Sequence, residues 1–194
     1  LAFLGDTGTG GENQERVARG MARRCQSEAD CRFIALLGDN IYPSGVKSAD
    51  DKQFITKFEE PYKHLDFRFY AVLGNHDHYG KIDAQIDYSK RSTKWVMPER
   101  FYRFTVGEAE FFAIDSDDFD PPQSKWLDER LQASKARWKI VLGHRPIYSY
   151  GWHGDDPDLI EDLEPLLVKH KVNFYLCGHE HEQQVLQLKG YYEV

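Results

Sequence analysis

Five apolar segments of this sequence each run directly into a glycine and then into an Asp, Asn or His residue. The five junctions are Gly5-Asp6, Gly38-Asp39, Gly74-Asn75, Gly143-His144 and Gly178-His179. Glycine lets the backbone turn at the end of a strand without a Cβ clash. In open α/β sheets, ligands bind just beyond the carboxyl ends of the strands. The pattern therefore predicts parallel strands that bring these polar side chains to one edge of the fold.

Between the junctions, strand patterns alternate with helical ones. The predicted strands are 1–4, 33–37, 67–73, 101–106, 110–114, 138–142, 172–177, 184–188 and 191–194. The predicted helices are 12–28, 48–62, 82–92, 124–136 and 158–171, with Phe54 and Phe58, for example, at four-residue spacing. This alternation favours an α/β layered fold. The hairpin at 101–114 indicates a mixed rather than an all-parallel sheet.

Length and composition restrict the possible partners. A chain of 194 residues is expected to form one domain, residues 1–194. The net charge of −7 disfavours a nucleic-acid-binding face, which needs a basic surface. No apolar run reaches the ~20 residues of a membrane span, so we expect no membrane partner. As a separate expectation, the chain is a monomer. Because both ends lie inside strand-like runs, we interpret the chain as an excerpt of a slightly longer one, with any signal peptide outside it.

The chain contains three cysteines. Cys25 and Cys31 are close in sequence, between a predicted helix and a predicted strand, and can pair in an oxidising compartment. Two surface thiols are the alternative. Cys177 stands in an apolar run and is expected to be a buried apolar side chain.

Polar residues at and just after the junctions can ligate metal ions. They are Asp6, Asp39, Tyr42, Asn75, His144, His179 and His181. This set can hold two cations if the carboxylate of Asp39 bridges them. Carboxylate, phenolate and amide oxygens suit hard cations, and imidazole suits iron, zinc and manganese.

The sequence motifs of several other kinds of active site are incomplete or absent in this chain. The segment 5–11 lacks the Lys-Ser/Thr ending of a phosphate-binding P-loop, and Asn13 stands where a dinucleotide fingerprint needs its third glycine. Gln183 replaces the second histidine of a zinc-protease helix, and no Gly-x-Ser-x-Gly nucleophile elbow is present.

The order of the motifs resembles the calcineurin-like metallophosphoesterases. It runs Asp6-x-Gly8, Gly38-Asp39-x-x-Tyr42, Gly74-Asn75-His76-Asp77, Val141-x-x-His144 and Gly178-His179-x-His181. A tyrosine three residues after the second Asp, here Tyr42 after Asp39, is a feature that resembles the purple acid phosphatases. The segments 74–80, 84–90 and 175–179 resemble the small tartrate-resistant type of that family. The resemblance implies a four-layer αββα sandwich of mixed sheets, metallo-dependent phosphatase-like, within the α/β (α+β) class.

The resemblance also implies two metal sites. A ferric ion, Fe(III), would be held by Asp6, Asp39, Tyr42 and His181. A divalent ion (Fe, Zn or Mn) would be held by Asp39, Asn75, His144 and His179. A hydroxide on the metals would attack the phosphorus of a phosphomonoester in line. The chain is thus expected to be an acid phosphatase.

Three further residues receive catalytic roles by the same resemblance. His76 would hydrogen-bond the phosphate or protonate the leaving alkoxide, and Asp77 would orient His76. His153 matches a substrate-side histidine of the tartrate-resistant type, although an exposed loop histidine is the alternative.

The expected partner is a small phosphoester or a phosphorylated protein, in a secreted, periplasmic or lysosomal-type compartment. Two alternatives stay open. One is a phosphodiesterase or nucleotide-specific hydrolase of the same superfamily. The other is a protein whose iron serves redox or storage purposes.

Overall fold

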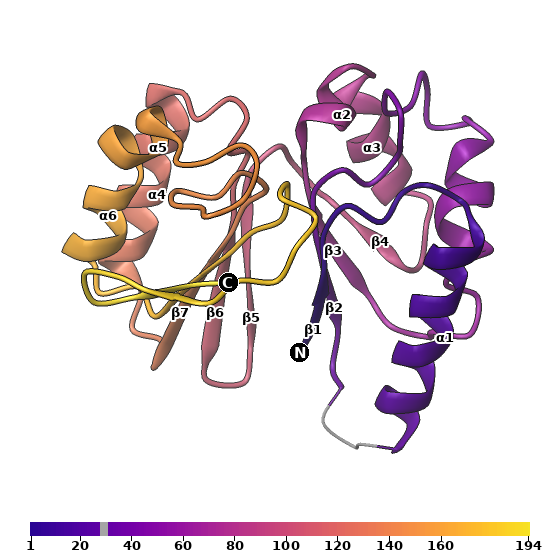
Figure 1. Ribbon diagram of the computed structural model, residues 1–194, viewed down its shortest axis with the longest axis horizontal. Coiled ribbons are helices and arrows are strands. Elements are labelled where there is room, and N and C mark those ends of the chain that lie inside the picture. Colours follow the sequence, from indigo (N-terminus) through magenta and orange to yellow (C-terminus); the bar gives the residue numbers. More distant parts are fainter. Residues whose placement is uncertain (28–30) are drawn as a thin grey trace.

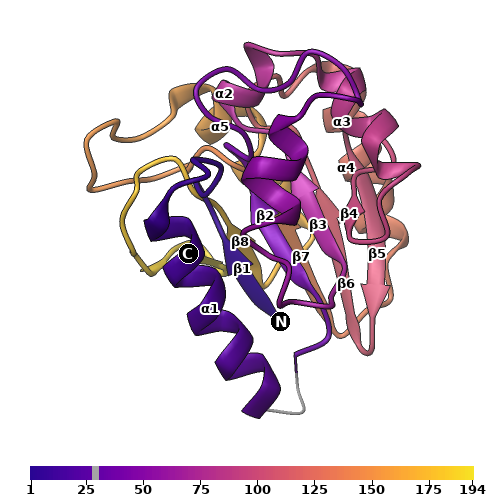
Figure 2. The ribbon, with the colours of Figure 1, turned by 90° about the vertical axis from the view of Figure 1, so that its right-hand side faces the viewer.

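Two β-sheets face each other at the centre of the fold, and helices cover both outer faces (Figure 1). The structure is a computed structural model that describes residues 1–27 and 31–194. Helices α1 and α3 lie outside one sheet, and α4, α5 and α6 lie outside the other, as a second view also shows (Figure 2). The predicted four-layer αββα sandwich is confirmed.

The first sheet has the strand order β1-β2-β3-β4, and its described strands all run parallel. These strands are Ala2–Leu4, Ile34–Leu37, Phe69–Val72 and Trp95–Val96. The second sheet has the order β5-β6-β7-β8-β10-β9. Its strands are Tyr102–Val106 (β5), Ala109–Ala113 (β6), Trp138–Leu142 (β7), Phe174–Leu176 (β8), Leu186–Gln187 (β9) and Tyr192–Glu193 (β10). This sheet is the mixed one, because antiparallel pairs at both edges flank parallel strands in the middle.

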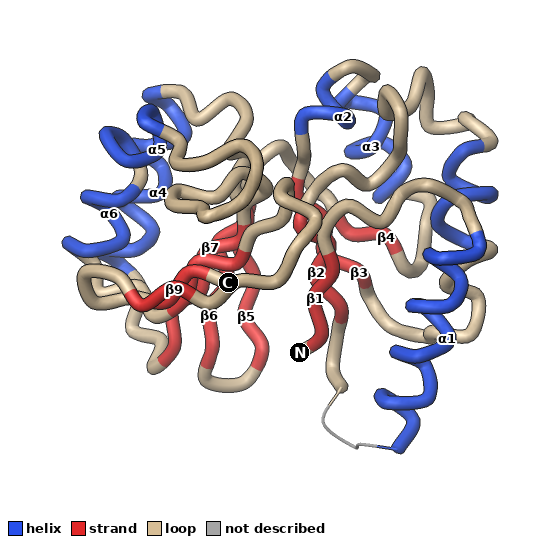
Figure 3. Tube along the Cα trace, viewed as in Figure 1, coloured by secondary structure: helices blue, strands red, loops and turns tan. Residues whose placement is uncertain are grey.

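Helical segments connect most of the parallel strands (Figure 3). They are α1 (Glu12–Ser27), the π-helical segment η1 (Ile55–Glu59), α2 (Asn75–His78), α3 (Ile82–Ser89), α4 (Pro121–Ala133), α5 (Pro157–Asp162) and α6 (Glu164–Lys169). The predicted end of the first helix at Glu28 lies outside the described residues. Within the described residues, no helix is long and apolar enough to cross a membrane.

Some elements differ from the prediction. The helix predicted over 48–62 begins only at 53 and is mostly η1, because the Asp51 carboxylate accepts the backbone N–H groups of Lys47 and Gln53 in a turn. The helix predicted over 158–171 divides into α5 and α6 around Leu163, since Pro165 has no N–H to donate to the preceding turn. The short strand β4 and helix α2 escaped prediction because each is under five residues long.

Alternate residues of the inner strands face two apolar layers. Phe111 and Leu142 are buried between the two sheets, where the Phe33 ring lies 5.1 Å from the Phe111 ring. The adjacent residues Phe112 and Val141 pack instead among the side chains of the α4–α6 layer. This two-residue period is the geometry of a strand buried on both faces.

The glycine junctions let the two sheets approach closely at one edge. Gly38 has φ +85°, and a Cβ added there would lie 2.5 Å from Nδ1 of His144, in the other sheet's loops. A Cβ on Gly178 would lie 2.6 Å from Oδ2 of Asp6. Larger residues would therefore push apart the side chains that the junctions bring together.

Two of the three cysteines form a disulfide, and the third is a free thiol. A disulfide joins Cys25, in α1, to Cys31, just before β2. Cys177 is free and only partly buried, and it packs against the apolar layer between the second sheet and its helices.

Candidate metal centre and active site

Four of the predicted ligands have backbone torsions that side chains rarely adopt. Asp6, Asp39, His179 and His181 have φ values of 58°, 50°, 76° and 55°. Non-glycine residues with positive φ are uncommon and concentrate at functional sites, where the surrounding structure enforces them.

Three donor side chains form the centre of the cluster. The ligand atoms of Asp6, Asp39 and His144 all lie within 4.8 Å of one another, although they come from both sheets. His144 is fully buried, and its Nδ1 lies 2.8 Å from the carbonyl oxygen of Leu37. That carbonyl can only accept, so Nδ1 carries the proton and Nε2 presents a lone pair to the cluster, 3.5 Å from Oδ1 of Asp39.

Two further donors surround His144 Nε2. Oδ1 of Asn75 lies 3.1 Å away, and Nδ1 of His179 lies 3.2 Å away. Burial is the main cause that lowers the pKa of His179 to about 4, and the nearby Arg145 guanidinium acts in the same direction. His179 therefore stays neutral and keeps a lone pair available.

Tyr42 and His181 complete the opposite side of the cluster. The Tyr42 hydroxyl lies 3.3 Å from Oδ1 of Asp6 and 3.0 Å from Nε2 of His181, which in turn is 3.5 Å from the same Asp6 oxygen. Burial and the nearby carboxylates of Asp6 and Asp39 raise the pKa of Tyr42. A phenolate would need a cation beside it.

The donor set fits two cations. Lone pairs of carboxylate, amide and imidazole groups converge at distances that suit ligands around a shared ion better than partners of one another. The side of Asp6 and Tyr42 is richer in anionic oxygen, which a hard trivalent ion prefers, and the side of His144 and His179 is richer in nitrogen. Asp39 lies between the two sides.

His76 lies beside the cluster rather than in it. Its backbone N–H donates to Oδ1 of Asp39 over 2.9 Å, and its ring is 4.5 Å from the Tyr42 ring. Nδ1 is 2.6 Å from the carbonyl oxygen of Pro43, so Nδ1 is the protonated nitrogen. Nε2 is 3.9 Å from Oδ2 of Asp39, on the side of the cluster.

The contacts of Asp77 do not support its predicted role as the group that orients His76. The buried Asp77 carboxylate accepts hydrogen bonds from the backbone and side chain of Asn40, from the Gly74 N–H and from the Gln85 side chain. Asp77 sits in the first turn of α2, so its side chain points back toward the loops that carry Asp39 and Asn75. It braces those loops, and the Pro43 carbonyl orients His76 instead.

His153 lies on the other flank of the cluster. Its ring is 4.1 Å from the His179 ring, and its backbone N–H and Nδ1 lie 3.2 and 3.3 Å from Oε2 of Glu180. About half of the His153 side chain is exposed. His153 is thus an exposed loop residue, as in the alternative, and its ring also packs on His179, a predicted ligand.

The calcineurin-like phosphoesterase family profile matches residues 1–183. The chain belongs to the calcineurin-like phosphoesterase family. Tartrate-resistant acid phosphatase type 5 of Mus musculus is 38% identical over 88% of this chain, and purple acid phosphatase 7 of Arabidopsis thaliana is 33% identical over 93% of it. The matches span 61% and 64% of those relatives, so the chain corresponds to less than two thirds of either.

Two solved structures illustrate the fold. GAP50, the anchor in the inner membrane complex of Plasmodium, superposes with a TM-score of 0.88 at 27% identity, over 99% of this chain and 69% of that one. The purple acid phosphatase PPD1 from yellow lupin superposes with a TM-score of 0.70 at 18% identity, over 91% of this chain and 37% of that one. Because PPD1 is only 18% identical to this chain, this similarity shows the phosphoesterase fold alone.

Two residues that support this candidate site were not predicted from the sequence. Ser116 Oγ accepts the backbone N–H groups of His144 and Arg145, each over 2.9 Å. Glu180, only 4% exposed in its side chain, holds the His153 loop. Both had a sequence signal, because Ser116 follows β6 at the same edge and Glu180 stands between His179 and His181.

Proposed function

We propose that this chain is the catalytic domain of an acid phosphatase that hydrolyses phosphomonoesters. One observation carries the proposal: donor atoms of Asp6, Asp39 and His144 lie within 4.8 Å of one another, with Tyr42 3.3 Å from Asp6. The similarity to tartrate-resistant and purple acid phosphatases supports the same activity.

The proposed centre assigns the donors to two ions. Fe(III) would be held by Asp6, Asp39, Tyr42 and His181, and a divalent Fe, Zn or Mn ion by Asp39, Asn75, His144 and His179. When bound, two such cations supply an activated water at neutral or acidic pH and polarise the phosphoryl oxygens. The chain's own contribution is to fix the donors through the Leu37 carbonyl at His144 and the Asp77 bracing of the Asp39 loop.

Two histidines would handle the substrate. His76 Nε2 faces the cluster, and a proton held there can pass to the oxygen of the leaving group. His153, packed on His179, would bind the substrate from the opposite flank. Their positions on two sides suit a phosphoester lying between them.

The substrate would be a small phosphoester or a phosphorylated protein, hydrolysed by a monomer in a secreted, periplasmic or lysosomal-type compartment. The Cys25–Cys31 disulfide supports an oxidising compartment, because such bonds are rare where glutathione and thioredoxin keep thiols reduced.

The test combines metal analysis with two substrates. Purified protein should contain two metal ions per chain, one of them iron, should be purple or pink, and should hydrolyse p-nitrophenyl phosphate faster than bis(p-nitrophenyl) phosphate. Faster diester turnover would instead identify a phosphodiesterase. Iron uptake without hydrolysis of either ester would favour a redox or storage role. Absence of both iron uptake and hydrolysis would instead favour a non-enzymatic role, such as that of GAP50 as an anchor.

A further inference from the structure

Highly exposed aromatic side chains occur beside the proposed active site. In residues 1–27 and 31–194, the aromatic side chains that are more than half exposed are Tyr79 (68%), Tyr150 (90%) and Trp152 (93%). Tyr79 follows α2, and the other two stand in the loop between β7 and α5. Figure 2 shows this orange loop projecting from the body of the fold. Large rings left in water lose the favourable free energy of burial, which a bound partner would restore.

The exposed aromatic residues lie near the two histidines that are proposed to contact the substrate, His76 and His153. The Tyr79 ring meets the His76 ring edge-on, with 5.5 Å between centroids. Trp152 directly precedes His153 in sequence, and Tyr150 stands three residues before it. The His76 ring packs on Tyr42, whereas the His153 ring packs on His179, so the two histidines adjoin opposite sides of the donor cluster.

The loop that carries Tyr150 and Trp152 is held in place by polar contacts. The backbone N–H of Tyr150 donates to Gln184 Oε1 over 3.1 Å, that of Gly151 to Ser149 Oγ over 2.8 Å, and that of His153 to Glu180 Oε2 over 3.2 Å.

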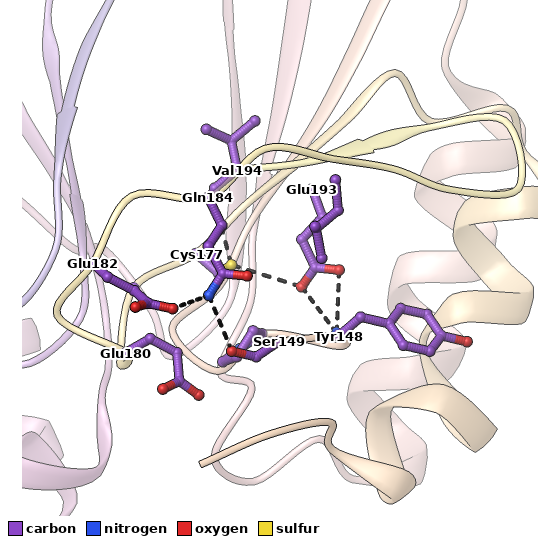
Figure 4. Close-up of a pocket in the computed structure, with 11 residues that line it drawn as sticks. Tyr148, Ser149, Cys177, Glu180, Glu182, Gln184, Glu193 and Val194 are labelled. Atoms are coloured by element: carbon purple, nitrogen blue, oxygen red, sulfur yellow. Dashed lines mark hydrogen bonds between the residues drawn. The ribbon is translucent and has the colours of Figure 1, made fainter. Parts of the chain in front are cut away.

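Behind the loop, Gln184 links Ser149 and Glu182 (Figure 4). The pocket there, about 30 Å³, has room for a water or two and not for a substrate. The loop therefore presents its aromatic rings outward from a fixed backbone, an arrangement that lowers the entropy lost on binding.

The charged residues near the loop limit the class of leaving group that can bind there. Asp155, Asp158 and Glu182 are exposed in or beside it, and the chain as a whole is acidic. A leaving group with further phosphates would be repelled by these carboxylates, whereas a neutral or cationic one would not.

We propose that Tyr150 and Trp152, with Tyr79 on the opposite side, form an aromatic rim that selects phosphomonoesters whose leaving group is one uncharged aromatic ring, as in a phosphorylated tyrosine side chain. The ring stacks on the rim while the phosphoryl group enters the donor cluster. This inference rests on the proposed phosphatase function and adds the class of leaving group.

The test compares two non-hydrolysable ligands with the same phosphonate head, phenylphosphonate and methylphosphonate, so that leaving-group reactivity plays no part. Dissociation constants are measured by calorimetry on the metal-loaded protein. Trp152→Ala should weaken phenylphosphonate binding about three- to tenfold, the range for one aromatic stacking contact, with methylphosphonate binding changed less than twofold. Tyr150→Ala should act in the same direction. Because Trp152 is 93% exposed, its removal should not disturb folding.

Trp138→Ala is the matched control. Trp138 is also an exposed tryptophan, but it begins β7, at the other end of the strand from the Gly143-His144 junction. It should leave both dissociation constants unchanged. Equal weakening of both phosphonates by Trp152→Ala, or no weakening of either, would overturn the aromatic rim alone. Protein that takes up no metal, binds neither phosphonate and does not hydrolyse β-glycerophosphate would refute the phosphatase function and the rim with it.

Discussion

Nε2 of His144 lies 3.2 Å from Nδ1 of His179, although the two residues follow different strands and are 35 positions apart. The Leu37 carbonyl fixes the protonated nitrogen of His144 as Nδ1, so Nε2 offers a lone pair. Burial lowers the pKa of His179 to about 4, which keeps that ring neutral as well. Two neutral imidazoles held in this way are well suited to share a cation, and Asp39 connects them to the remaining donors.

Asp39→Ala should remove both metal ions and the phosphatase activity with them. Asp39 is 2% exposed and lies between the two groups of donors, so neither ion would retain its full ligand set. Metal content by elemental analysis should fall from two ions per chain to less than one. Asp83→Ala, an exposed carboxylate in α3, serves as the control. Full activity in the Asp39 variant would contradict the bridging position.

His76→Ala should retain both ions and lower kcat by about 10²–10⁴, the usual contribution of a positioned proton donor. The contacts of His76 with Asp39 include its backbone N–H, which alanine preserves. Metal analysis and steady-state kinetics on the same preparation check both parts. Loss of metal from this variant would mean that His76 is a ligand.

Asp77→Ala should destabilise the fold by about 2–4 kcal/mol, because it leaves several buried N–H donors without an acceptor. Denaturant unfolding measures this loss. Asp87→Ala, which removes an exposed partner of Lys90, should leave the free energy of unfolding essentially unchanged.

The same Asp77 variant also distinguishes bracing from catalysis. If its stability and metal content stayed normal while kcat fell a hundredfold, then Asp77 would act on His76 after all.

The ion pair between His78 and Asp115 should make stability depend on pH. Nε2 of His78 lies 2.9 Å from Oδ1 of the fully buried Asp115, and this hydrogen bond raises the pKa of His78 above 6.5 despite partial burial. The charged pair is fully present below the unfolded pKa of about 6.5, and its contribution is lost as pH rises through the higher folded pKa. Arg100 Nε, 3.8 Å from Asp115 Oδ2, stays charged throughout.

His78→Asn should therefore lower the free energy of unfolding by about 1 kcal/mol at pH 5.5 and by less at pH 8.5. Thermal or denaturant unfolding at the two pH values measures the difference, with the exposed His64→Asn as the matched control. An equal loss at both pH values would show that the ring contributes by packing and not by charge.

The sequence by itself determined the strand junctions. Each glycine followed by Asp, Asn or His marks a turn at the end of an apolar run, and such local signals depend on only a few neighbouring residues. The junctions sufficed to nominate Asp6, Asp39 and His144. The alternation of strand and helix patterns predicted an α/β layered fold, and the four-layer arrangement was implied by the family resemblance. The apolar runs on either side of Gly107 also sufficed to predict the hairpin at one edge of the second sheet.

Only the tertiary structure decided how the nominated residues meet. The contact of Asp39 with His144 depends on two sheets packing face to face, and the bracing of Asn40 by Asp77 depends on a helical turn that no local pattern predicts. His78, in α2, pairs with Asp115, in the loop after β6, and Glu180 reaches His153 across 27 positions. These contacts join residues far apart in the chain, so they are set by packing of the whole core and not by the propensities of any one segment.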